Sequence, residues 1–138
     1  NAQARYITGD VKLKNASTAL DVYLAINRPE GTNIEVYARF NNASNASFIE
    51  GTSPGGGSPG DINDRNFVKL AHSPIPINTD RTKFPEVNFR FDFADVLNED
   101  TITDSIEEFT EFSVKIVMLS EGSERVPSVR ELRCIATV

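Results

Sequence analysis

The stretch Val-Asn-Phe-Arg-Phe-Asp-Phe, residues 87–93, decides the fold class of this 138-residue chain. Apolar and polar side chains alternate along its whole length. This period of two is typical of a β-strand with one face against a core and the other toward water or a partner. Aromatic and β-branched side chains also suit a pleated surface. We therefore predict a strand here, with Val87, Phe89, Phe91 and Phe93 in the core.

The same alternation recurs along the rest of the chain. It is found in residues 20–27, 34–40, 112–118 and 132–138, and more weakly in residues 5–13 and 67–71. Gly9 interrupts the first weak segment, where it predicts a bulge or bend. We expect Val114, Ile116 and Met118 to join the phenylalanines in the core. About seven short strands, with no helix for parallel crossovers, predict an all-β chain folded as an antiparallel β-sandwich of jelly-roll or Greek-key type.

The turn at Arg-Pro-Glu-Gly, residues 28–31, is the clearest local feature. Pro29 fixes φ for a tight turn, and Gly31 relaxes the exit from it. Because two cleanly alternating segments flank this turn, we predict that they pair with each other as a β-hairpin.

Two segments lack any strand or helix period. Residues 41–66 include the Gly-, Ser- and Pro-rich run 51–60, which predicts a long, flexible and exposed loop that serves as a contact arm. Residues 95–108 have no apolar stripe at helical spacing, so we expect at most a short turn. The chain length corresponds to a single domain over residues 1–138. Since its first residue is Asn rather than Met, the chain is either processed or a piece of a longer protein, and we favour a piece.

The composition argues against several classes of partner. Twenty Asp and Glu against fourteen Lys and Arg give a net charge of −6, which disfavours general binding to nucleic acid or anionic membranes. One cysteine and one histidine exclude an internal disulfide and a zinc site built mainly from these residues. The longest aliphatic run, residues 116–119, is far too short to span a bilayer, so we expect no membrane insertion.

No catalytic constellation is visible in the sequence. We interpret His72 as a turn or surface histidine, and Cys134 as a small buried hydrophobe rather than a reactive thiolate. Glycosidase chemistry would need two carboxylates at a fixed separation, one of them with a raised pKa. The carboxylates that gather in the sequence are instead interpreted as a solvated acidic loop: Glu99, Asp100, Asp104, Glu107, Glu108 and Glu111. We predict no enzyme, no catalytic residue and no cofactor.

One segment resembles part of a cation-binding loop. Asp61, Asn63, Asp64 and Asn66 supply alternating oxygen ligands of the kind that calcium prefers. The EF-hand pattern requires Gly at its sixth position and an acidic residue at its twelfth, where this chain has Asn66 and His72. Turn formation is therefore the favoured interpretation, with calcium as the alternative, and no metal site is predicted. Three glycosylation sequons are likewise interpreted as ordinary turn residues, at Asn15, Asn42 and Asn45.

Four stretches together carry a family resemblance. They are Ala-Arg-Tyr-Ile-Thr at 4–8, the segment 21–37 with its Arg-Pro-Glu-Gly-Thr turn, Asp-Arg-Asn-Phe-Val-Lys-Leu at 64–70, and Lys-Ile-Val-Met within 112–118 followed by residues 126–127 and 132–136. In this order they resemble a domain near the C-terminus of large virion structural proteins of tailed phages, especially myoviruses that infect marine cyanobacteria. The Gly-rich middle and the acidic loop are unmatched. The resemblance implies a part of the tail, baseplate or fibre apparatus, with no catalytic residues to carry over. It also implies that this chain is a C-terminal piece of a longer virion protein.

The resulting functional expectation is a non-catalytic structural component of a phage tail, in its baseplate, fibre or neck region. Such a protein is made in the host cytoplasm and resides in the virion, where it contacts other phage structural proteins and copies of itself as a homo-oligomer. Several outward positions are apolar or aromatic: Tyr23, Tyr37, Val117, Leu119 and Ile135. Outward tyrosines are ordinary on sheets, but the outward Val117 and Leu119 suggest a covered face. The alternative is a receptor- or glycan-binding module at a tail tip. It ranks second because Trp is absent and the calcium pattern is poor.

Overall fold

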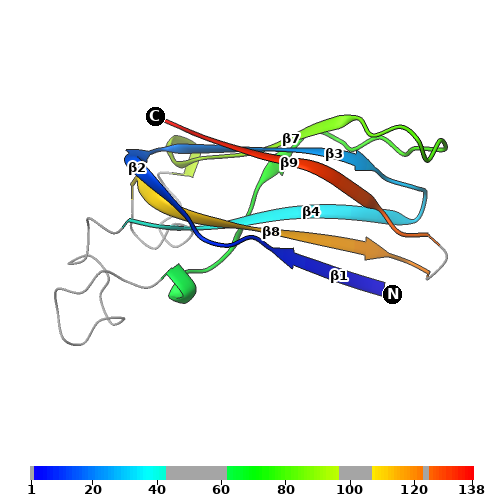
Figure 1. Cartoon of the computed structure of the whole chain (residues 1–138), viewed down its shortest axis with the longest axis horizontal. Helices are drawn as coiled ribbons and strands as arrows, with labels where there is room; N and C mark the ends of the chain where they lie inside the picture. The colour runs from blue at the N-terminus through cyan, green and yellow to red at the C-terminus, as the bar shows by residue number, and fades with distance from the viewer. Residues whose placement is uncertain (1, 43–61, 97–106, 123–124) are drawn as a thin grey trace.

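A computed structural model describes residues 2–42, 62–96, 107–122 and 125–138, which form two antiparallel sheets packed face to face (Figure 1). The predicted all-β sandwich is therefore confirmed. The strands in the described residues are β1 Ala2–Ile7, β2 Val11–Ser17, β3 Ala19–Asn27, β4 Thr32–Asn41, β5 Val68–Lys69, β6 Ala71–His72, β7 Glu86–Asp92, β8 Phe109–Ser120 and β9 Ser128–Thr137. Two short 3-10 helices accompany them, η2 Ile62–Asp64 and η3 Phe93–Val96.

Each sheet draws its strands from distant parts of the chain. The first sheet, here called sheet A, has the order β1-β8-β4-β5, and β2 continues beyond β1 along the same edge of β8. The second, sheet B, has the order β6-β7-β3-β9. Most consecutive strands lie in different sheets, so the chain passes repeatedly across the core, as it does in Greek-key and jelly-roll sandwiches.

The predicted hairpin at residues 28–31 is wrong. The turn itself forms, since Gly31 has a φ of 80° and the Thr32 backbone N–H donates to the Pro29 carbonyl at 3.2 Å. The strands that it joins do not pair: β3 pairs with β7 and β9, whereas β4 pairs with β5 and β8. A period of two identifies the buried face of a strand but not its hydrogen-bonding neighbour. Here the two apolar faces meet across the core instead of lying side by side in one sheet.

The core lies between the sheets and is dominated by phenylalanine. Five rings pack with neighbouring centroids 4.7–6.0 Å apart: Phe40, Phe91, Phe93, Phe109 and Phe112. Of the predicted core residues, Val87, Phe89, Phe91, Phe93, Val114 and Ile116 are buried. Met118 is only half-buried and packs against the cluster, and Phe93 lies in η3 rather than in a strand.

The weaker sequence signals correspond to interrupted strands. The segment 5–13 breaks around Gly9 into β1 and β2, which confirms the predicted bend. The segment 67–71 divides at the buried Leu70, because β5 belongs to sheet A and β6 to sheet B. The predicted loop over 41–66 is described only at its ends, and its run 51–60 lies outside the described residues, as do residues 97–106. No helix in the described ranges is long and apolar enough to cross a membrane.

The two sides of the sandwich differ in how their sheets end. On one side the edge strands, β5 and β6, contain two residues each. On the other side sheet A ends in β1 and β2, and sheet B ends in the ten-residue β9. Very short edge strands prevent pairing with other chains, whereas long ones present a row of unpaired backbone groups. β5 and β6 pair with only two residues each of β4 and β7, so the long outermost strands in the described part of the chain are β1, β2 and β9.

Candidate functional site

His72 and Cys134 lie on opposite edge strands of sheet B. The register aligns His72 with Phe89, Phe89 with Val22 and Val22 with Cys134, so three strand spacings, about 14 Å, separate the two residues. His72 Nδ1 is 2.7 Å from the Ser73 carbonyl oxygen, and its ring packs against Phe89. Burial raises the pKa of the half-buried Cys134 thiol. His72 and Cys134 are therefore too far apart to act together as a general base and a nucleophile.

The acidic cluster is only partly described. Glu107 and Glu108 are exposed, and Glu111 on β8 accepts a hydrogen bond from Asn41 Nδ2 at 3.1 Å. The remaining carboxylates of that cluster lie outside the described residues: Glu99, Asp100 and Asp104. The described members therefore include one carboxylate held in a structural contact and two that face solvent.

The suggested cation loop holds one contact of a different kind. Asn63 Oδ1 accepts a hydrogen bond from Arg39 Nη2 at 3.0 Å, so a guanidinium already engages this candidate ligand oxygen. Asn66 is exposed, Asp61 lies outside the described residues, and so does the side chain of Asp64. Among the residues that the structure describes, no three His, Cys, Asp or Glu side chains are grouped to hold a metal ion.

The sequon asparagines fall in different environments. Asn15 is exposed on β2, and Asn45 lies outside the described residues. Asn42 is 1% exposed, and its side-chain amide donates to the Glu108 carbonyl at 3.2 Å. A glycan on Asn42 would need that buried amide to leave its site, so this sequon is structural in the folded chain.

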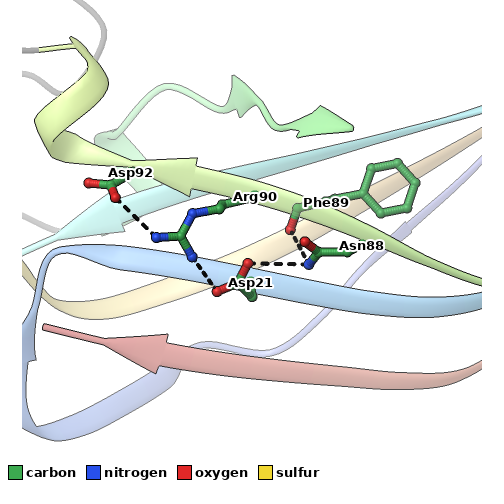
Figure 2. A network of polar contacts seen from close by, with 5 residues as sticks. All are labelled: Asp21, Asn88, Phe89, Arg90 and Asp92. Carbon is green, nitrogen blue, oxygen red and sulfur yellow. Dashed lines mark hydrogen bonds and ion pairs between the residues drawn. The ribbon is translucent and has the colours of Figure 1, made fainter. Parts of the chain in front are cut away.

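A polar network that the sequence analysis missed joins β3 and β7 on the outer face of sheet B (Figure 2). Asp21 on the central strand β3 is 9% exposed and accepts from Arg90 Nη1 at 2.5 Å and from Asn88 Nδ2 at 3.2 Å. Arg90 Nη2 also contacts Asp92 at 3.0 Å. The alternation identified Asp21 as outward, but β3 has a neighbour on each side, whose side chains cover it. These polar side chains are therefore hydrogen-bonded or ion-paired to one another. None of the network's acids or bases is left without a partner.

Cations also cover the outward tyrosines. The Arg133 guanidinium lies 4.6 Å from the Tyr23 ring centroid on sheet B, and the Lys115 ammonium lies 4.7 Å from the Tyr37 ring on sheet A. Val117 is only 4% exposed, because its register neighbours are Arg5 on β1 and Glu35 on β4. The outward apolar run on β8 is therefore largely covered by the chain itself rather than left for a partner.

Glu35 provides a pH-dependent contact on this face. A hydrogen bond from Lys69, at 3.1 Å, is the main cause that lowers the pKa of Glu35 below its ordinary value, and a hydrogen bond from the Tyr37 hydroxyl adds to it. A lowered carboxyl pKa in the folded state contributes stability above the unfolded pKa, and that contribution is lost as the pH falls through the folded value.

We therefore expect Lys69→Met to raise the pKa of Glu35 toward its ordinary value and to flatten the acid limb of the stability curve. Titration of the Glu35 carboxyl by NMR measures the first effect, and chemical denaturation from neutral to acid pH measures the second. Lys12→Met, at an exposed position on β2, is the matched control and should change neither. An unaltered Glu35 pKa in Lys69→Met would contradict this assignment.

The most exposed apolar side chains on the strands gather at one side of the sandwich. Tyr6 and Ile7 on β1 are 55% and 48% exposed, and Ile135 on β9 is 42% exposed. Val11 on β2 and Leu132 on β9 are also exposed. We call the edges of β1, β2 and β9 that pair with no other described strand, together with these side chains, the open edge.

A groove lies at the end of the sandwich next to the turn 28–31. It encloses about 600 Å³ and is lined by residues that include Gln3, Asn33, Leu119 and Glu121. Its arginine, Arg28, is already engaged, since Nε donates to the Thr32 carbonyl at 2.7 Å and Nη1 to the Ile75 carbonyl at 2.6 Å. The side-chain amides and the carboxylate would suit a hydroxyl-rich ligand, and the volume is within the range of small-molecule sites.

Comparison with known proteins adds no family assignment. No model of a protein family matches the chain, and no significant match is found with a curated protein or with a solved structure.

Proposed function

We propose that this chain is a non-catalytic structural component of a bacteriophage tail that joins subunits through protein–protein contacts at the open edge. The observation that carries the proposal is the difference between the two sides of the sandwich. Two-residue strands form the edges of one side, whereas longer strands with exposed apolar side chains form the edges of the other. Proteins that stay monomeric usually protect such edges with short strands, charges or bulges, and β1 at this edge has neither a register shift nor a lysine.

The phage assignment has a separate basis. It rests on the residues that resemble tail proteins, above all the Arg-Pro-Glu-Gly-Thr turn and the Lys-Ile-Val-Met segment of β8. The structure gives these stretches defined roles. The turn carries the chain from sheet B to sheet A, and β8 is the central strand of sheet A, with partners on both of its edges. Both are scaffold positions, in keeping with a structural module.

Glycan binding at a tail tip is the second candidate, and the groove beside Gln3, Asn33 and Glu121 is the observation that favours it. A saturable interaction in a screen of purified chain against host-surface glycans, abolished by Glu121→Ala but not by Glu107→Ala, would support this candidate. Glu107 is an exposed acidic residue in a different part of the chain and serves as the charge-matched control.

Immunogold labelling of intact phage particles tests the tail assignment. Antibodies raised against the purified chain should mark the tail, baseplate or fibres at a small number of copies per particle. Labelling spread over the capsid shell, or absence of the protein from purified particles by mass spectrometry, would overturn it.

A further inference from the structure

We infer that β1 pairs with β1 of a second copy of this chain, antiparallel and about a twofold axis at Ala4, so that sheet A continues across the two copies. This inference rests on the proposed function, because it names the partner of the open edge. It concerns β1 alone among the three strands of that edge.

The three strands differ in how well they resist pairing. Within the open edge β9 is irregular, because its register against β3 shifts and Glu131 adopts a φ of 58°. The register of β2 against β8 also shifts, and its exposed residues include Lys12 and Lys14. Bulges and lysines are the devices by which natural edge strands avoid pairing. β2 and β9 are therefore protected against pairing with a strand of another chain.

β1 carries none of these devices. It pairs with β8 over six consecutive residues without a shift, from Ala2↔Ser120 to Ile7↔Lys115. Its sequence Ala-Gln-Ala-Arg-Tyr-Ile contains one charge and neither Gly nor Pro. No other described strand pairs with its far edge. A regular, nearly uncharged edge of this length is a template for another strand.

The faces of the sheet restrict the register. A twofold axis perpendicular to sheet A makes the core-facing sides of the two copies one continuous face. Residues directly opposite each other point to the same face, so even-numbered residues of β1 must lie opposite even-numbered residues of the second copy. Centring on Ala4 aligns residues 2–6 and sets Arg5 opposite Gln3. Centring on Arg5 would set two arginines directly opposite each other, which is destabilising. Centring nearer either end of β1 would align only three residues. Charge and overlap thus select the Ala4 register.

Tyr6 gives this register an apolar contact. It is aligned with the buried Ile116, so it lies on the core-facing side of sheet A, yet it is 55% exposed because no described element covers it. In the Ala4 register Tyr6 lies diagonally across from Ala4 of the second copy, within reach of an aromatic ring. The small Ala4 side chain leaves room for that ring. The pairing therefore covers an exposed aromatic side chain that the single copy leaves in water.

Cysteine cross-linking tests the register. In a Cys134→Ser background, Ala4→Cys should form an intermolecular disulfide at least tenfold faster than Ala71→Cys, an exposed alanine on β6 at the opposite side of the sandwich. Gln3→Cys and Arg5→Cys should each cross-link slowly alone and rapidly when mixed, because these two positions face each other. Equal rates for Ala4→Cys and Ala71→Cys would overturn the inference.

Self-association provides the second measurement. By sedimentation equilibrium we expect Ala4→Lys to raise the dimer Kd at least tenfold, with Ala71→Lys unchanged, since Ala4 is exposed and its replacement leaves the fold intact. If Ala4→Lys does not fold, the cross-linking result decides. A parent chain that stays monomeric while Ala4→Lys abolishes binding to another tail protein would refute self-pairing but leave the proposed function standing. A dimer in solution without tail labelling on particles would support self-pairing but refute the proposed function.

Discussion

Replacing Phe40 with alanine is expected to reduce the free energy of unfolding by about 3–5 kcal/mol. Phe40 is 4% exposed, and its ring lies 5.1 Å from Phe91, 5.2 Å from Phe93 and 4.7 Å from Phe109. These rings come from both sheets and from η3. Truncation at Phe40 therefore loses buried apolar area and leaves a cavity where the sheets meet, and the surrounding strands can close it only in part.

Urea denaturation followed by circular dichroism measures this effect. Domains of this size are stable by about 5–15 kcal/mol, so Phe40→Ala should lower the midpoint strongly or prevent folding. Ile77→Ala is the matched control: Ile77 is apolar but 53% exposed, and its truncation should change stability by no more than about 0.5 kcal/mol. Equal midpoints for the two variants would show that Phe40 does not join the sheets.

The sequence predicts the sandwich and its core well because a period of two reports directly on burial. Phe89 and Phe91 alternate with the exposed Asn88 and Arg90, as the pattern requires. Met118 shows the limit of that logic. Its position in the alternation is correct, but β8 is bordered there by β1, whose core-facing side no described element covers, so Met118 is only half-buried.

Strand pairing could not be predicted in the same way. The segments on either side of residues 28–31 alternate as a hairpin would, yet they belong to different sheets. Pairing depends on contacts between residues far apart in the sequence, such as Val36 with Ile116. The same reason hides the burial of Asp21, which follows from β3 having neighbours on both sides. The local alternation of apolar and polar residues carries no information about strand pairing or about the burial of Asp21.

The candidate site illustrates this limit for function. Sequence reasoning weighed chemically active side chains such as His72 and Cys134, and the structure places them on opposite edges of one sheet. It gave no special role to Tyr6, an apolar residue in a weakly alternating segment. Whether a strand lies at an edge is a property of the assembled sheet. The alternation of a segment is the same at an edge and at the centre, so no local signal could have identified the open edge.

Asn27→Ala is expected to destabilise the fold by about 1–3 kcal/mol, because it removes two hydrogen bonds that each contribute about 0.5–1.5 kcal/mol net. Asn27 ends β3 and is 3% exposed. Its side-chain amide donates to the Asp80 carbonyl at 2.8 Å and to the Lys83 carbonyl at 2.7 Å. One side chain therefore holds two points of the long connection between β6 and β7, and its loss leaves both carbonyls without this donor.

Two further variants separate that hydrogen-bonding role from simple loss of volume. Asn15→Ala, at an exposed position on β2, removes the same atoms and should be nearly neutral in thermal denaturation. Asn27→Asp keeps the size of the side chain but replaces the donor amide with a carboxylate, whose oxygens would face two carbonyl oxygens. At neutral pH it should be at least as destabilising as Asn27→Ala, because a buried charge opposite acceptors costs more than a missing donor. If Asn27→Asp retained the parent stability while Asn27→Ala lost it, packing rather than hydrogen bonding would hold the connection in place.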